Sequence, residues 1–452
     1  MVPLGALAFT AGAGFALTTL DVCPVRAEAL LLVDVDSGKV ISEQNATYPW
    51  YPASVTKLMT TYVTFKAVRD HRINLESVFT VSPNAVAQQP SKMGFKVGTR
   101  VTVDNALKML LVHSANDMAV VLAEGVSGSI EKFTEEMNAE ARHLGMTQTN
   151  YVNPNGLPAD EQVTSARDLA ILARALILEF PEYDYYWHIA SIRLGRRTFP
   201  NTNRLIDAFA GTDGMKTGFI CASGFNLVAT ATRGGKRLIA VVLGAKSSTG
   251  RIVKAAQLFE RGFGTDPLTW LVPSQGAVDT LEPVAATPPD MHEEVCANNR
   301  RRRATEDDDE GAEAGTASTE AANGEPSMLP LWSLRGAALL TSGLAAGIPP
   351  VEVYTGPARN NVTSNQAAVP AAKKRTLAVA AKPPAAKLPP PRAAKPATAT
   401  AVAHPSPATA AGTKPSSGKP LPGSDRAATA AAGPKTKPAL KPAQVAPKTG
   451  PQ

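Results

Sequence analysis

The order of strand and helix patterns most strongly constrains the fold of this 452-residue chain. Apolar patterns predict a hairpin of strands 29–35 and 40–43 around the turn Asp36-Ser37-Gly38, and later strands at 192–199, 225–231 and 237–244. Helical spacing predicts helices at 54–69, 103–112, 115–124, 130–144 and 165–179, and a last helix at 249–261. Because strands stand at both ends, we expect an α/β (α+β) fold in which one antiparallel sheet unites the two ends and a helical block is inserted between its strands.

Three short strings occur in this region: Ser54-Val55-Thr56-Lys57, Ser114-Ala115-Asn116 and Lys216-Thr217-Gly218. A serine nucleophile needs a group that takes its proton, a group that returns a proton to the leaving group, and a cation for a substrate carboxylate. The three strings provide these groups. The helical pattern after Ser54 places Lys57 one turn away from it. The strings together indicate an active-site serine acyltransferase.

Taken singly, each string has a plain structural interpretation, since a serine at a helix start is usually an N-cap and an isolated lysine is usually at the surface. The chain also contains further copies. Ser129 opens a helix with a glutamate-rich, solvated face, and Ser82 and Asn84 repeat the second string. Copies at 416–419 and 448–450 lie in Pro/Ala-rich sequence that cannot fold around a substrate. The prediction therefore depends on all three strings in their contexts.

The combination resembles that of penicillin-binding proteins and class A β-lactamases. Over residues 28–264 the wider sequence resembles the low-molecular-mass penicillin-binding proteins, the serine D-alanyl-D-alanine carboxypeptidases. Seven blocks in the family's order carry this resemblance: Leu31-Leu32-Val33-Asp34, Pro52-Ala53-Ser54, His113-Ser114-Ala115-Asn116-Asp117, Asn153-Pro154-Asn155-Gly156-Leu157, Ala166-Arg167-Asp168-Leu169-Ala170, Asp213-Gly214-Met215-Lys216-Thr217-Gly218 and Ser223-Gly224-Phe225-Asn226-Leu227. The resemblance implies the penicilloyl serine transferase, or β-lactamase-like, fold.

The same resemblance implies the catalytic roles. Ser54 would attack the carbonyl of the penultimate D-alanine of a peptidoglycan pentapeptide stem, form an acyl-enzyme and release the terminal D-alanine. Lys57 would accept the serine proton, and burial and a neighbouring ammonium both favour the neutral lysine that this requires. Ser114 would relay a proton to the leaving amine, and Asn116 would hold the acyl-side amide or Lys57. β-Lactam antibiotics would be covalent inhibitors.

The resemblance also implies the substrate-binding residues. Lys216 and Thr217 would bind the terminal carboxylate, while Gly218 lets the substrate backbone lie close to the strand. The backbone N–H groups of the nucleophile and of Phe219 would stabilise the oxyanion. Arg251, at the start of the last helix, matches a second carboxylate-binding position.

Other functions stay open at this point. A DD-endopeptidase would cut the same bond within a peptidoglycan cross-link. Class A β-lactamases place a glutamate before an asparagine in a loop after the second string, but residues 152–156 contain no acid, and Glu161 stands in the wrong context. The third alternative is a non-catalytic wall-binding or scaffold protein. The intact pair of Ser54 and Lys57 argues against it, because such a protein does not need this pair. Asn201 and Asn203 match a family pair, but as loop asparagines we interpret them as structural.

The first residues predict export. Residues 2–20 carry no charge, and Val25-Arg26-Ala27 is typical of cleavage after Ala27, so we expect a signal peptide at 1–27 and a catalytic domain at 28–264. No Lys or Arg precedes the apolar run, so an uncleaved anchor is the alternative. The catalytic domain is expected in the periplasm or at the outer face of the cytoplasmic membrane.

The folded part is expected to end near Gly264. Residues 265–327 form a segment of uncertain order with a charged linker, and the uninterrupted part of the apolar segment 328–350 is too short to span a bilayer core of about 30 Å. Residues 351–452 are rich in Ala, Pro and Lys. We expect them to form a long disordered tail, because they lack the apolar groups that offset ordering entropy.

Composition limits the partners and cofactors. The formal net charge of +7 resides largely in tail lysines without interleaved aromatics, so no nucleic-acid partner is expected. We expect the basic tail to be a solvated linker, and weak association with a wall or membrane surface is the alternative. The six histidines show no metal-ligand spacing, and we expect neither metal nor cofactor. Cys23 is expected to leave with the signal. Cys221 and Cys296 could pair in an oxidising compartment, but we expect them to be unpaired, because Cys296 falls where order is doubtful.

Overall fold

The structure, a computed structural model, describes residues 28–264, 276–297, 339–341, 344 and 347–357. The predicted signal peptide, most of residues 298–350 and the predicted tail beyond residue 357 lie outside the described residues. Within the described ranges, no helix has the length and apolarity needed to cross a membrane.

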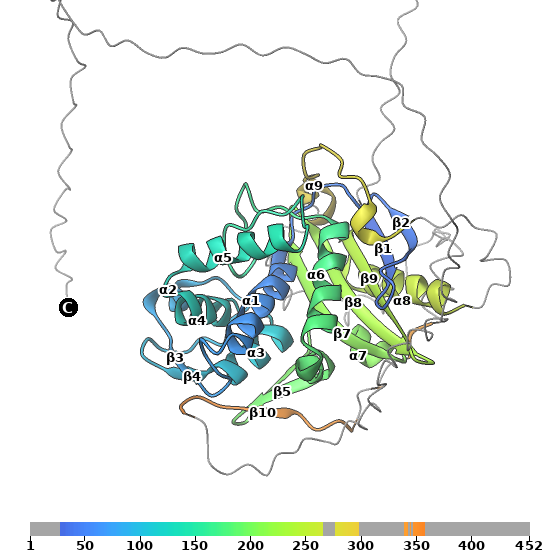
Figure 1. The fold of residues 1–452 in the computed structure, drawn as a ribbon. Coiled ribbons are helices and arrows are strands. Elements are labelled where there is room, and N and C mark those ends of the chain that lie inside the picture. Colours follow the sequence, from blue (N-terminus) through green and yellow to red (C-terminus); the bar gives the residue numbers. More distant parts are fainter. Residues whose placement is uncertain (1–27, 265–275, 298–338, 342–343, 345–346, 358–452) are drawn as a thin grey trace, which may run out of the picture. The chain divides into compact units, whose positions relative to one another are not determined.

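One five-stranded sheet joins the two ends of the catalytic region (Figure 1). Its strands are β1 (Ala29–Asp34), β2 (Val40–Gln44), β7 (Thr212–Ile220), β8 (Gly224–Arg233) and β9 (Lys236–Ala245). They stand in the order β2-β1-β9-β8-β7, and every neighbouring pair is antiparallel. The early β1 lies against the late β9, so the prediction that one antiparallel sheet unites both ends is confirmed.

Both faces of this sheet are covered, which explains the continuous apolar runs of its central strands. Successive side chains of a strand point to opposite faces. Leu31 and Val33 of β1 therefore join the core shared with the helical block, whereas Leu32 joins a second core with Phe259 of α8 (Ser248–Phe263). On the helical-block side, α6 (Ala166–Glu179) packs against β1 and β9.

The helical block stands between β2 and β7 in the sequence. It contains the 3-10 helix η1 (Ala53–Thr56), α1 (Lys57–Arg69), α2 (Pro83–Ala87), α3 (Val103–Val112), α4 (Asn116–Ser127), α5 (Ile130–His143), α6, the 3-10 helix η2 (Pro181–His188) and α7 (Leu205–Ala208). Two short strands, β3 (Val78–Thr80) and β4 (Arg100–Thr102), pair beside these helices. Helix α1 packs against α3, α4, α5 and α6 and is the buried centre of the block.

Two serines in further copies of the short strings, Ser129 and Ser82, are helix caps. Ser129 Oγ accepts a hydrogen bond from the Lys132 N–H at 3.2 Å and begins α5, as the sequence predicts. Ser82 Oγ accepts from the Ala85 N–H at 3.1 Å and begins α2. Both serines thus have the ordinary N-cap role.

The strand predicted at 192–199 is instead a hairpin. β5 (Ser191–Leu194) and β6 (Arg197–Pro200) pair around Gly195, whose φ of +59° is easily adopted only by glycine. The other edge of β5 pairs in parallel with β10 (Val351–Val353). The assignment of residues 351–353 to the tail is therefore wrong, because Val353 is 2% exposed and the edge of β5 supplies backbone partners.

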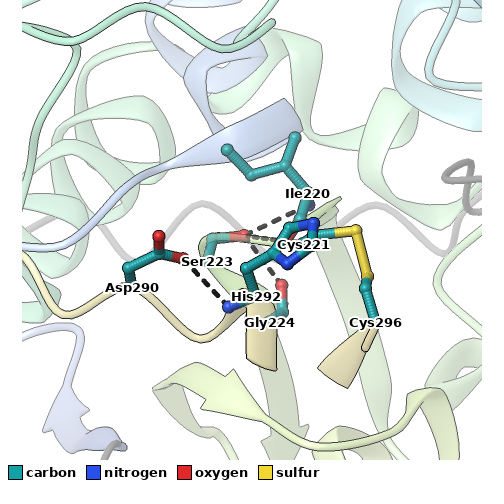
Figure 2. Close-up of a disulfide and its surroundings, with 7 residues drawn as sticks. All are labelled: Ile220, Cys221, Ser223, Gly224, Asp290, His292 and Cys296. Carbon is teal, nitrogen blue, oxygen red and sulfur yellow. Dashed lines mark hydrogen bonds between the residues drawn. A yellow bond between two sulfur atoms is a disulfide. The ribbon is translucent and has the colours of Figure 1, made fainter. Parts of the chain in front are cut away.

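The folded part also extends beyond Gly264, contrary to the prediction. Ala277 bridges to Lys39 just before the 3-10 helix η4 (Val278–Thr280), and α9 (His292–Val295) leads to Cys296. Cys296 forms a disulfide with Cys221 (Figure 2). The prediction of two unpaired cysteines is wrong, because residues 276–297 pack back onto the domain and bring Cys296 to the turn after β7.

Candidate active site

Ser54 lies in the turn that leads into α1. It is half-buried within η1, directly after Ala53, whose φ of +48° is left-handed. Asn226 of β8 donates from Nδ2 to the carbonyl oxygens of Tyr51 at 2.9 Å and Pro52 at 3.2 Å. A left-handed alanine persists only where its surroundings over-determine it. The sheet provides part of that restraint, so the nucleophile candidate sits where sheet and helical block meet.

Lys57 begins α1, and its side chain is fully buried. Its Nζ lies 2.7 Å from Ser54 Oγ, 2.8 Å from Asn116 Oδ1 and 2.7 Å from the Asn155 carbonyl oxygen. The two carbonyl-type oxygens can only accept, so they take N–H groups from Lys57. Of these three partners, the Ser54 hydroxyl is the one that can exchange a proton with the amine.

Ser114 and Asn116 stand at the junction of α3 and α4. Ser114 has a φ of +58° and is 1% exposed, and its Oγ has no hydrogen-bond partner within the described part of the chain. Asn116 begins α4 and donates from Nδ2 to the Gln89 carbonyl oxygen at 2.9 Å. A buried, unpaired hydroxyl on a left-handed residue is unusual outside functional sites. Ser114 Oγ is available to a group of the substrate.

Asp117 anchors the loop of residues 88–94 to α4. Its carboxylate accepts from the backbone N–H groups of Met93 at 3.1 Å and Gly94 at 3.0 Å. Burial raises the pKa of Asp117 above its ordinary value, against the opposing effect of these donors. Asp117 belongs to one of the seven family blocks, but no role was predicted for it.

The loop of residues 152–157 also contacts Lys57. Asn155, whose carbonyl accepts from Lys57, donates from Nδ2 to Gln88 Oε1 at 2.7 Å, and this bond ties the loop to residues 88–94. Gly156 lies so close to the turn of Ser54 that a Cβ there would overlap the Ala53 carbonyl. A backbone carbonyl leaves no signal in the sequence, so the contact of Asn155 with Lys57 was not predicted.

Gln162, rather than its neighbour Glu161, supports that loop. Gln162 is 2% exposed, and its Oε1 accepts from the N–H groups of Val152 and Asn153 at 2.8 and 2.9 Å. Glu161 is exposed. The buried residue at this point is thus an amide that holds backbone, not an acid that could activate water.

The third string lies on β7, at the edge of the main sheet. Lys216 is fully buried and donates from Nζ to the Thr217 carbonyl oxygen at 3.0 Å, and Thr217 Oγ1 donates to Thr202 Oγ1 at 2.9 Å. A Cβ at Gly218 would lie 2.9 Å from the Ser54 backbone nitrogen. Glycine therefore lets β7 approach the Ser54 backbone closely.

Asn201 and Asn203 hold the loop that carries Thr202. Asn201 donates from Nδ2 to the Ile189 carbonyl oxygen and accepts from the Asn203 N–H, both at 2.8 Å. Asn203 donates from Nδ2 to the Gly214 carbonyl oxygen at 2.8 Å. These hydrogen bonds agree with the structural interpretation of both asparagines.

Phe219 and Arg251 belong to the side of the sheet that α8 covers. The Phe219 ring stacks on Phe225 with 4.3 Å between ring centroids and packs against the α8 core. Arg251 of α8 is 3% exposed, lies over the same Phe225 ring and donates from Nη1 to the Asn226 carbonyl oxygen at 3.3 Å. Asn226 pairs with Gly218 across β7 and β8, so Arg251 reaches the strand that borders the third string.

The arrangement can support serine acyl transfer. The buried amine of Lys57 contacts both the Ser54 hydroxyl and the Asn116 amide oxygen, and Gly218 brings a buried cation-bearing strand beside Ser54. Among the residues that the structure describes, His, Cys, Asp and Glu side chains form no group of three or more that could hold a metal ion.

Comparison with protein families gives one match that spans the site. The sequence pattern of peptidase S11, described as D-alanyl-D-alanine carboxypeptidase, matches residues 17–247. Among curated proteins, D-alanyl-D-alanine carboxypeptidase DacC of Escherichia coli K12 is 39% identical over 252 residues, covering 54% of this chain and 63% of that protein. DacD of the same strain is 37% identical over 265 residues, covering 56% and 68%. The chain thus spans only about two thirds of these relatives' length.

Solved structures show the same similarity. D-alanyl-D-alanine carboxypeptidase DacD from Francisella tularensis superposes with a TM-score of 0.51 at 31% identity, covering 52% of this chain and 70% of that chain. Penicillin-binding protein 6B from Escherichia coli superposes with a TM-score of 0.50 at 37% identity, covering 52% and 76%.

Proposed function

Because the chain belongs to the peptidase S11 family of D-alanyl-D-alanine carboxypeptidases, we propose that it removes the terminal D-alanine of peptidoglycan pentapeptide stems through an acyl-enzyme on Ser54. The observation that carries the proposal is the contact set of Lys57, whose buried Nζ lies 2.7 Å from Ser54 Oγ and 2.8 Å from Asn116 Oδ1.

In the acylation step, Ser54 Oγ forms a bond to the carbonyl carbon of the penultimate D-alanine, and its proton passes to Lys57. Asn116 Oδ1 and the Asn155 carbonyl hold two N–H groups of the amine, which leaves the lone pair of neutral Lys57 for the serine proton. The backbone N–H groups of Ser54 and Phe219 stabilise the charge on the substrate oxygen. Gly218 keeps β7 close enough for both donors to serve one oxygen.

The amide bond then breaks, and the leaving amine needs a proton. Ser114 relays it: its buried Oγ, uncommitted within the described residues, gives its proton to the amine and takes the one that Lys57 received from Ser54, so both side chains regain their starting state. The carboxylate of the departing D-alanine binds Lys216 and Thr217, with Arg251 as a second cation. Water hydrolyses the Ser54 ester and regenerates the free hydroxyl. A β-lactam that follows the same first step forms an ester on Ser54 and acts as a covalent inhibitor.

The loop of residues 152–157 favours this function over that of a β-lactamase. No acidic side chain stands in it, and the buried Gln162 holds its backbone while Glu161 is exposed. An acyl-enzyme formed from penicillin therefore lacks the general base that class A enzymes use.

The proposed location is the periplasm or the outer face of the cytoplasmic membrane. The Cys221–Cys296 disulfide supports it, because disulfides persist in oxidising compartments. The proposed partners are peptidoglycan stem peptides, with weak wall association through the basic tail.

A covalent label combined with product analysis tests the proposal. The purified chain should bind labelled penicillin stoichiometrically at Ser54 and release D-alanine from a soluble pentapeptide stem. Ser54→Ala should abolish both, whereas Ser129→Ala, which removes a helix cap of the same local string, should keep both. An adduct on another serine, or D-alanine release by Ser54→Ala, would contradict the proposal. A cross-linked dimer of stems, used as a second substrate, distinguishes a DD-endopeptidase, which cuts the cross-link, from a carboxypeptidase.

A further inference from the structure

The Cys221–Cys296 disulfide attaches directly beyond the third string. β7 ends at Ile220, so Cys221 is the first residue of the β7–β8 turn. Within the turn, the Ile220 N–H donates to Ser223 Oγ at 3.2 Å, and Ser223 Oγ donates to the Gly224 carbonyl at 2.8 Å (Figure 2). The turn is thus a compact unit whose position fixes the end of β7.

The segment bound by this disulfide also meets the domain through non-covalent contacts, since Val295 packs against both hydrophobic cores. α9 has four residues, too short to be stable alone. The Met291 N–H donates to the Ala222 carbonyl oxygen at 3.0 Å, and Met291 is 1% exposed against Gly224. Figure 2 shows the disulfide joining the turn to the residue that follows α9. The disulfide therefore joins the turn covalently to a segment that is not part of the sheet.

The same turn reaches the nucleophile's loop. Trp50 is 1% exposed and donates from Nε1 to the Ser223 carbonyl oxygen at 3.0 Å, four residues before Ser54. On the strand side, Gly218 lies against the Ser54 backbone three residues before the turn begins at Cys221. A displacement of the turn would change how closely β7 approaches Ser54.

We propose that the Cys221–Cys296 disulfide positions the carboxylate-binding strand, holding the β7–β8 turn so that residues 216–218 keep their place beside Ser54. The inference rests on the proposed function of that strand. Opening the disulfide leaves the Ser54 and Lys57 contact intact, since that contact lies within one helical turn. It loosens the hold on the terminal carboxylate, so substrate binding weakens more than the chemical step.

Steady-state kinetics test this on the full chain with a soluble pentapeptide, at a temperature where circular dichroism shows every sample folded. The double variant Cys221→Ser, Cys296→Ser should raise KM about tenfold and lower kcat by less than about threefold. Reduction of the folded wild type with a phosphine should give the same change, and reoxidation should reverse it. Lys246→Ala is the matched control. It breaks the exposed Lys246–Glu294 ion pair on the same segment but keeps the disulfide, and it should leave KM unchanged.

A lower melting temperature with wild-type kcat and KM in both the double variant and the reduced enzyme would overturn the inference, since the disulfide would then only stabilise the fold. If the double variant does not fold, the reduced wild type decides by the same KM criterion. Penicillin labelling and KM separate the two proposals. An oxidised wild type that is labelled but releases no D-alanine contradicts the proposed function, while an unchanged KM after reduction contradicts the positioning role.

Discussion

At the scale of the residue, the contacts of Lys57 determine how strongly each substitution at this position slows acylation. Lys57→Arg should slow penicillin acylation of Ser54 about as much as Lys57→Ala, by a factor of roughly 100 to 10,000. A guanidinium does not give up its proton, and its planar fork does not match acceptors gathered around one buried Nζ. Lys216→Arg keeps a cation and should cost less. Stopped-flow labelling measures all three rates. Near-normal acylation in Lys57→Arg would mean that another group is the base.

The buried carboxyl of Asp117 leads to a prediction about how the stability of the fold depends on pH. Because burial raises its pKa, the folded state holds this proton more tightly than the unfolded state. The stabilisation that comes from the Asp117 carboxyl is therefore fully present below the ordinary Asp pKa of 3.8. It is lost as the pH rises through the folded-state pKa of Asp117. Asp117→Asn does not titrate, and it loses an acceptor for the Met93 and Gly94 N–H groups. We expect it to be less stable at pH 7 by about 1 to 3 kcal/mol.

The gap in unfolding free energy between wild type and Asp117→Asn should widen as the pH falls from about 7 to about 4. Urea unfolding at several pH values measures it. A gap that narrows on acidification would show that the backbone donors outweigh burial and that the folded-state pKa is lowered. Gln88→Ala, which removes the bond to Asn155 but no titrating group, is the control and should show a pH-independent gap.

Residues that meet through local geometry were predictable from the sequence. Ser54 and Lys57 are one turn apart, so their 2.7 Å contact follows from the helical pattern. Asn116 was found through its string. The Asn155 carbonyl and the Asp117 carboxylate were missed as parts of the site, because the first is backbone and the second acts through a loop whose fold no local pattern encodes.

At the scale of the element, helices with their own caps were predicted well, and elements that depend on distant partners were not. α5 begins after its cap Ser129 as expected. β10 has three residues and exists only through its parallel pairing with β5. The disulfide joins positions 75 residues apart, and closing such a loop stabilises a fold by about 4 kcal/mol in the chain-entropy picture. Nothing near Cys296 in the sequence indicates that return.

At the scale of the whole molecule, the folded region includes two segments that the sequence assigned elsewhere. Residues 276–297 pack through the Ala277 bridge and the disulfide, and β10 completes the three-stranded sheet with β5 and β6. A cut near Gly264 would therefore remove covalent and strand contacts of the domain. A cut after Ser327 would spare the disulfide but remove β10.

The last prediction compares two truncations. Ending the chain after Pro357 removes only residues beyond β10 and should keep D-alanine release from a soluble pentapeptide within about threefold of full length, a barrier change of about 0.7 kcal/mol or less. It should also lose salt-sensitive binding to isolated cell walls, because the sequence of residues 358–452 is rich in lysine. Ending it after Ser327 should give similar rates but lower the free energy of unfolding by about 1.5 to 3 kcal/mol, since the burial of Val353 is lost.

Thermal unfolding and the kinetic assay on the same samples separate these effects. Equal stability of the two truncations would mean that β10 adds nothing to the β5 edge. A large loss of activity in the chain ending at Pro357 would mean that residues 358–452 take part in the chemical step, because every described contact of the site, from Lys57 to Thr217, lies before residue 264 and is intact in that variant.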